Sequence, residues 1–74
     1  MATRRQFAVC VKNDGYEASL ELRKIYEVLP DSVGERHRQI RVVDESGEDY
    51  LFPTAWFAPI ELPAPIRRAV LAAL

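Results

Sequence analysis

The chain has 74 residues, enough for one small domain but too few for a second domain or a deep substrate cleft. Hydrophobic residues make up 49% of it, a share that is ordinary for a folded domain and too high for a disordered one. Ten basic and eleven acidic residues give a net charge of −1, which argues against a dominant phosphate-binding surface.

The single cysteine and the short apolar runs restrict both compartment and site chemistry. Cys10 has no second thiol for an internal disulfide, and one cysteine with one histidine does not make a zinc site. The apolar run from Phe7 to Val11 is much too short for a signal peptide or a membrane span. We therefore expect a cytoplasmic protein with no membrane segment and no cofactor.

The N-terminal part predicts a short arm and then a strand. Residues 1–5 are expected to form a flexible basic arm. In residues 6–12, β-branched and aromatic residues alternate with smaller ones, which predicts a half-buried strand. The face expected to point into the core carries Phe7, Val9 and Val11, which leaves Cys10 on the opposite face.

A loop and a second strand follow. Asn13-Asp14-Gly15 is a strong turn signal, because Asn and Asp bond their own backbone and Gly accepts a positive φ. Residues 24–29 are rich in strand formers and predict a strand that ends before Pro30. Residues 30–38 are polar and show no periodicity, which predicts a loop.

The most specific local pattern is a β-hairpin that begins with a strand over residues 39–43. Asp44-Glu45-Ser46-Gly47 fits a type I turn whose glycine is left-handed and forms a bulge. The pairs that this register predicts are Asp44 with Glu48, Val42 with Tyr50, and Ile40 with Phe52. A two-residue turn would shift the register by one residue and expose both aromatic side chains. We therefore predict the bulged register, with Tyr50 and Phe52 in the core.

The remainder predicts a short turn, a last strand and a helix. Pro53 ends the preceding strand because it has no N–H to donate, and residues 54–56 fit a 3-10 turn. Residues 57–62 predict the last strand. Residues 63–74 predict a C-terminal helix, because proline is tolerated in the first helical turn. The apolar stripe expected on this helix consists of Ile66, Val70 and Leu74.

Together these elements predict a mainly β fold. Five short strands with a 3-10 turn before the last one match a small SH3-like barrel over residues 6–62, followed by the helix over residues 63–74. An oligonucleotide-binding barrel is the main alternative. It normally has a helix between its third and fourth strands, and residues 44–47 are too few to form one.

Two stretches of the chain also resemble a known family. Residues 16–31 and 40–53, with Ile60-Glu61-Leu62-Pro63 behind them, resemble a family of small uncharacterised bacterial proteins of about this length. The resemblance spans residues 7–63, and it implies an SH3-like barrel without an assigned function. At Arg23 the chain departs from the pattern, since many members have Gly there, so the entrance to the second strand lacks the glycine of a tight turn.

No pattern predicts catalysis, and we expect a protein-interaction module that is not an enzyme. If Tyr16 and Trp56 share a surface, they form a groove like the one in which SH3 domains bind extended proline-rich peptides. The other interpretation of Trp56 is that it plugs the end of the barrel. Val70 and Leu74 would bind a protein partner, the barrel or a second copy, because so short an apolar helix is not stable alone in water.

Two charged patterns give alternatives. A nucleic-acid-binding small barrel is the second hypothesis, and its contacts would be Arg36, Arg38 and Arg41. The acidic turn could hold a cation through Asp44, Glu45, Glu48 and Asp49. Its spacing does not follow the EF-hand loop, and we favour a solvated turn that protects the sheet edge.

Overall fold

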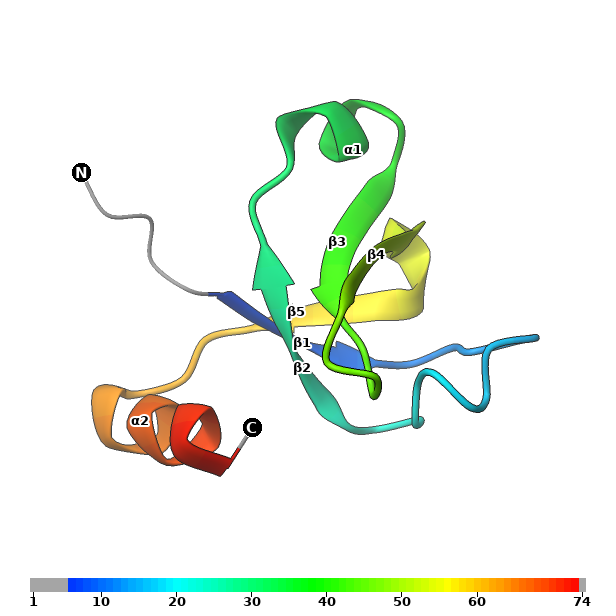
Figure 1. The fold of residues 1–74 in the computed structure, drawn as a ribbon. Helices are drawn as coiled ribbons and strands as arrows, with labels where there is room; N and C mark the ends of the chain where they lie inside the picture. The colour runs from blue at the N-terminus through cyan, green and yellow to red at the C-terminus, as the bar shows by residue number, and fades with distance from the viewer. Residues whose placement is uncertain (1–5, 74) are drawn as a thin grey trace.

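The computed structural model describes residues 6–73, and the centre of the molecule is an antiparallel sheet (Figure 1). Its five strands are β1 (Gln6–Cys10), β2 (Ile25–Leu29), β3 (Gln39–Val43), β4 (Asp49–Pro53) and β5 (Phe57–Ile60). They lie in the order β4-β3-β2-β1-β5, so β1 is between the second strand and the last. The helical elements of the described residues are α1 (Ser32–Arg36), the 3-10 turn η1 (Thr54–Trp56) and α2 (Ala64–Ala73).

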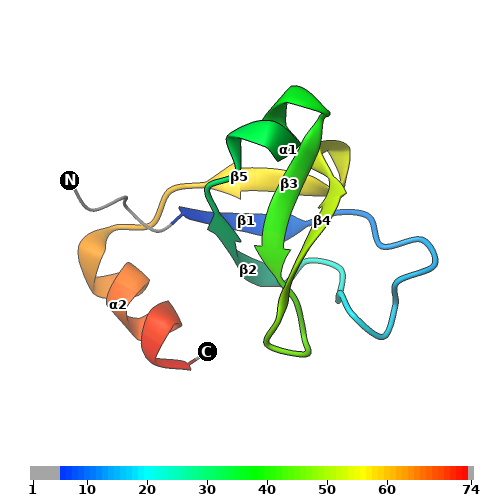
Figure 2. The same cartoon turned by 45° about the horizontal axis from the view of Figure 1, so that its top comes forward.

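The expected mainly β class, the 3-10 turn before the last strand and the C-terminal helix are therefore confirmed. In both Figure 1 and Figure 2 the β3–β4 hairpin runs across β1 and β5 at a steep angle. The sheet is thus strongly twisted, and its inner face holds the core. Closure of the strands into a barrel stays a prediction, and the expected basic arm, residues 1–5, lies outside the described residues.

β1 turns the opposite face to the core from the one predicted. Ala8 and Cys10 are fully buried in the core, whereas Val9 is only half-buried and Val11 is exposed. Aromatic rings from β2, β4 and β5 fill the core, so β1 can pass beneath them only with small side chains. Phe7 lies on the outer face and is buried there beneath α2.

The β3–β4 hairpin has the predicted register. Ile40 pairs with Phe52 and Val42 with Tyr50, and the Asp44 N–H donates to the Glu48 carbonyl at 3.0 Å. Gly47 has φ +86°, the left-handed conformation that the bulged turn requires.

The prediction that Tyr50 lies in the core is wrong, because its side chain is 47% exposed. Tyr50 shares the face of Phe52, but it lies two residues nearer the turn, beyond the edge of the packed core. Its hydroxyl donates instead to Glu48 Oε2 at 2.5 Å.

Part of the segment predicted as a loop forms the short helix α1. Asp31 caps this helix, with its Oδ1 atom accepting from the Gly34 N–H at 2.8 Å. A five-residue helix is too short to show a periodic pattern, so the capping aspartate was the one signal in the sequence.

Of the apolar stripe predicted on α2, Val70 is half-buried but Ile66 is not. Arg67, Val70 and Leu71 are half-buried, whereas Ile66 is 52% exposed. Leu74 lies outside the described residues. Within α2 no described side chain is buried, so the helix is only loosely packed. No helix within residues 6–73 is long and apolar enough to cross a membrane.

The entrance to β2 is a tight turn despite the missing glycine. Arg23 has φ +67°, and its N–H donates to the Cys10 carbonyl at 2.7 Å. The Lys24 N–H closes the turn on the Glu21 carbonyl at 3.4 Å. An L-residue in this conformation costs roughly 1–2 kcal/mol, so the backbone of this turn is strained.

We predict that Arg23→Gly stabilises the protein. Relief of the left-handed strain outweighs the extra freedom of glycine in the unfolded chain, for a gain of about 0.5–1 kcal/mol in the free energy of unfolding. Urea denaturation of the wild type and the variant measures this difference in the free energy of unfolding. Arg23→Ala is the matched control, since it removes the side chain and keeps the strain. A glycine variant that is no more stable than the alanine variant would contradict a strain larger than the entropic cost of glycine.

Candidate functional site

Three aromatic side chains meet in an aromatic cluster, formed by Tyr16, Phe52 and Trp56. Tyr16, from the loop between β1 and β2, packs edge-on against Phe52 with a centroid distance of 5.6 Å. The centroid of the Tyr16 ring is also 5.5 Å from the centroid of the Trp56 ring in η1. Tyr16 and Trp56 therefore share a surface, as the predicted binding groove requires.

The aromatic cluster runs from the core to the surface. Phe52 is buried and stacks on Trp56 at a centroid distance of 6.3 Å, with 28° between the ring planes. Trp56 is half-buried against the core, so it combines parts of both interpretations of this residue. Tyr16 is 51% exposed and is the member that a ligand can reach most directly.

A hollow of about 310 Å³ borders the exposed ring of Tyr16. The residues that line it, which we call the Tyr16 groove, are Tyr16, Ser19, Asp44, Ser46, Tyr50, Leu51 and Phe52. Trp56 lies outside this lining and supports the Tyr16 ring from the side. Sequence reasoning missed Tyr50 and Leu51, because the hairpin pattern gives their pairing but not where the core ends.

The loop that carries Tyr16 is held by its own hydrogen bonds. The Tyr16 N–H donates to the Asn13 carbonyl at 2.8 Å, and the Tyr16 carbonyl accepts from the Leu20 N–H at 2.9 Å. Asn13 Nδ2 donates to the Leu20 carbonyl at 2.8 Å, and the Leu20 side chain is fully buried. Tyr16 therefore lies on a braced loop rather than on a free one.

A second set of bonds, the Glu45 clamp, ties this loop to the β3–β4 turn. The Tyr26 hydroxyl donates to Glu45 Oε2 at 2.5 Å and accepts from the Glu21 N–H at 2.7 Å. Lys24 Nζ lies 2.6 Å from the same carboxylate oxygen. The Glu45 N–H donates to the Ser19 carbonyl at 3.0 Å, so both walls of the Tyr16 groove meet at this residue.

The Glu45 clamp shifts the protonation of its members. The hydrogen bonds from Lys24 and then from Tyr26 hold the pKa of Glu45 below its ordinary value. Burial, and next the bond to the Glu45 carboxylate, raise the pKa of Tyr26 above its usual range. The clamp therefore consists of a carboxylate, a neutral phenol and an ammonium group at neutral pH.

The four carboxylates of the acidic turn point to different partners. Asp44 Oδ1 accepts from the N–H and hydroxyl of Ser46, and Glu45 belongs to the clamp. Glu48 accepts from Tyr50, and Asp49 accepts from Arg41. Among the described residues no group of three or more His, Cys, Asp or Glu side chains is arranged to hold a metal ion.

The three arginines of the nucleic-acid hypothesis do not form one free patch. Arg41 Nε lies 2.8 Å from Asp31 and its Nη1 atom 2.9 Å from Asp49, and these bonds raise the pKa of Arg41. Arg36 and Arg38 are exposed at and just after α1. Two arginines near α1 thus remain for such contacts, which stay a prediction.

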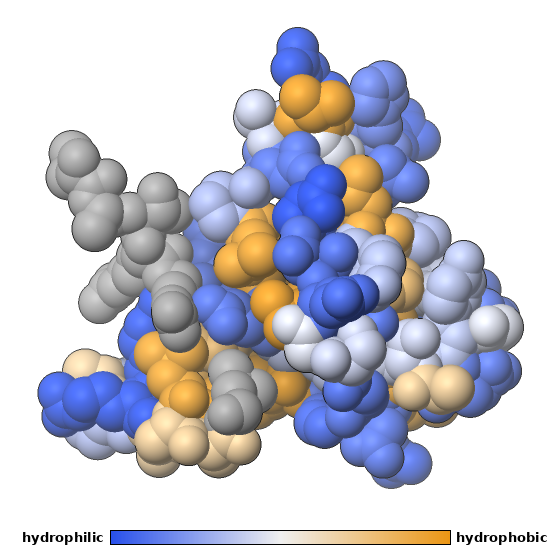
Figure 3. All heavy atoms as spheres, viewed as in Figure 1, coloured by the Kyte–Doolittle hydropathy of each residue, from blue (hydrophilic) through white to orange (hydrophobic). Residues whose placement is uncertain are grey.

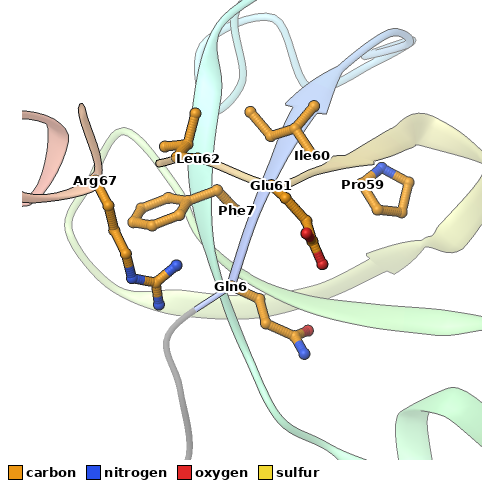
Figure 4. A pocket seen from close by; sticks show the side chains of 7 residues that line it. All are labelled: Gln6, Phe7, Pro59, Ile60, Glu61, Leu62 and Arg67. Carbon is orange, nitrogen blue, oxygen red and sulfur yellow. The ribbon is translucent and has the colours of Figure 1, made fainter. Parts of the chain in front are cut away.

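A second hollow, also of about 310 Å³, lies between the start of α2 and the outer face of the sheet. Figure 4 shows the Arg67 side chain beside the Phe7 ring, and the guanidinium carbon is 5.1 Å from the ring centroid. A third hollow, of about 290 Å³, lies at the other end of α2 near Ala73 and Ile25. Val70 is half-buried within this chain, which leaves only part of its side chain for a partner.

Comparisons with family models, with curated proteins and with solved structures yield no match for this chain. The resemblance to a bacterial SH3-like family therefore stays a prediction, and the functional argument rests on the geometry.

We predict that the Glu45 clamp weakens in acid. Because the folded-state pKa of Glu45 is lowered, its stabilisation is present above the ordinary carboxyl value of 4.5 and is lost as the pH falls through the folded pKa. The difference in urea midpoint between the wild type and Glu45→Gln should therefore be larger at neutral pH than at about pH 3. The pKa of Asp31 is also lowered, but Asp31 titrates in both proteins, so its contribution cancels in this difference. An equal difference at both pH values would contradict the role of the charge.

Proposed function

We propose that this chain is a non-catalytic, SH3-like module of the cytoplasm that binds an extended peptide segment of another protein in the Tyr16 groove. The strand order with β1 between β2 and β5, and the 3-10 turn before β5, support the SH3-like barrel. Cys10 is the one cysteine of the chain and is buried, so the fold does not depend on a disulfide, which suits a reducing compartment.

The observation that carries the proposal is the half-exposed Tyr16 ring, packed 5.5 Å from Trp56 beside a hollow. Aromatic side chains give a large contact area for the loss of only two side-chain rotations, and they dominate binding energies at interfaces. Here the ring is already fixed by Phe52, by Trp56 and by the loop, so little further ordering is needed on binding.

The charges around the groove favour a basic partner. Asp44 lines the Tyr16 groove, and Glu48 holds the hydroxyl of Tyr50 at its edge. Glu17 is exposed and directly follows Tyr16. Among residues 6–73, none of those that line the groove is Lys or Arg, so a peptide that combines proline with a basic residue fits both the surface and its charge.

We predict that Tyr16→Ala weakens binding of a proline-rich basic peptide by at least about tenfold, as expected for loss of a central aromatic contact. Titration with the peptide, followed by Trp56 fluorescence and by amide chemical shifts, measures the affinity. Leu22→Ala is the matched control, because Leu22 is 50% exposed on the same loop and does not line the groove.

Circular dichroism would establish that both variants fold. Equal affinities for the two folded variants would remove the Tyr16 groove as the binding surface. Binding of a labelled oligonucleotide at low salt, lost in the Arg36→Glu variant, would instead favour the nucleic-acid hypothesis.

A further inference from the structure

The chain itself carries a segment with the side-chain chemistry that the Tyr16 groove favours, although it lies in the first turns of α2 and is not extended. Residues 63–68 contain two prolines, an isoleucine and two arginines, and no acidic residue. Pro63, Pro65, Ile66 and Arg68 are all exposed. We call residues 63–68 the proline–arginine segment.

The start of α2 presents this segment outward. The Arg67 N–H donates to the Pro63 carbonyl at 2.8 Å, so the helix begins directly after Pro63. Since the half-buried residues Arg67, Val70 and Leu71 share one side of α2, helical geometry places Ile66 and Arg68 on the two flanks of the opposite, outer side. Ile66 is 52% exposed, and Figure 3 shows hydrophobic residues at the lower left, where α2 lies.

The groove and the segment of one chain cannot meet. Figure 1 and Figure 2 both place α2 at the left of the molecule and the loop that carries Tyr16 at the right, with the sheet between them. A contact between the two surfaces must therefore join two copies of the chain.

We propose that the Tyr16 groove of one copy binds the proline–arginine segment of a second copy, head to tail. This inference rests on the proposed function of the groove. Pro65 and Ile66 would lie against the rings of Tyr16 and Tyr50, and Arg68 would lie toward Glu48 at the edge of the groove. The acidic groove and the basic segment are complementary in charge, although the whole chain has a net charge of only −1.

Such a contact has a defined symmetry. It joins two different surfaces, so each copy can bind one neighbour through its groove and another through its segment, and the copies form a ring or an open chain. A dimer formed by two α2 helices would join the same surface on both copies and would stop at two. The two arrangements therefore respond differently to a variant that disables one surface.

The test is a complementation experiment on the full chain, read by sedimentation equilibrium over a range of concentrations. We expect Tyr16→Ala, which disables the groove, and Ile66→Glu, which disables the segment, each to weaken self-association at least tenfold. An equimolar mixture of the two variants should form heterodimers, because each brings one intact surface, and should form nothing larger. Leu22→Ala should associate as the wild type does.

Three results would overturn the inference. A wild-type chain that stays monomeric at millimolar concentration, a mixture that does not associate, or a Tyr16→Ala variant that still dimerises would each exclude the head-to-tail contact. The last result would point to an α2–α2 dimer. The proline-rich peptide titration decides the proposed function separately, so a groove that binds the peptide in a monomeric chain leaves that function standing.

Discussion

The structure depends on aromatic rings that pack over small side chains on β1. Tyr26, Phe52 and Phe57 fill the core, and Ala8 and Cys10 are fully buried beneath them. This arrangement sends Phe7 to the outer face of the sheet, where Arg67 of α2 covers it. It also lets the row of rings continue from Phe52 through Trp56 to Tyr16 at the surface. The core and the candidate site are thus one aromatic assembly.

The Glu45 clamp joins that assembly to the turns around it. The Tyr26 ring lies in the core, 6.4 Å from Phe57, while its hydroxyl bonds Glu45 and the backbone of Glu21. Tyr26 therefore contacts the core, the β3–β4 turn and the loop that carries Tyr16. Because the two walls of the Tyr16 groove come from this turn and this loop, the groove is shaped largely before any ligand arrives.

Local chemistry made some features predictable, and tertiary packing decided the others. Asp44 and Gly47 gave the hairpin register, because turn type fixes pairing without reference to the rest of the molecule. Alternation along β1 separated two faces but could not tell which is inside, since that depends on the rings that cross it. Tyr16 and Trp56 could be named as candidates, but the distance between them depends on how the loop and η1 fold together. The exposure of Tyr50 likewise follows from where the core ends.

The burial of Cys10 makes the thiol a reporter of the core. Its sulfur is fully buried and donates to the Lys12 carbonyl at 3.3 Å, and burial raises the pKa of the thiol. A thiol reagent can reach this atom only when β1 separates from its neighbours, so the labelling rate measures how often the sheet opens. The wild-type chain therefore contains a native probe of its own breathing motions, at the strand on which its aromatic packing depends.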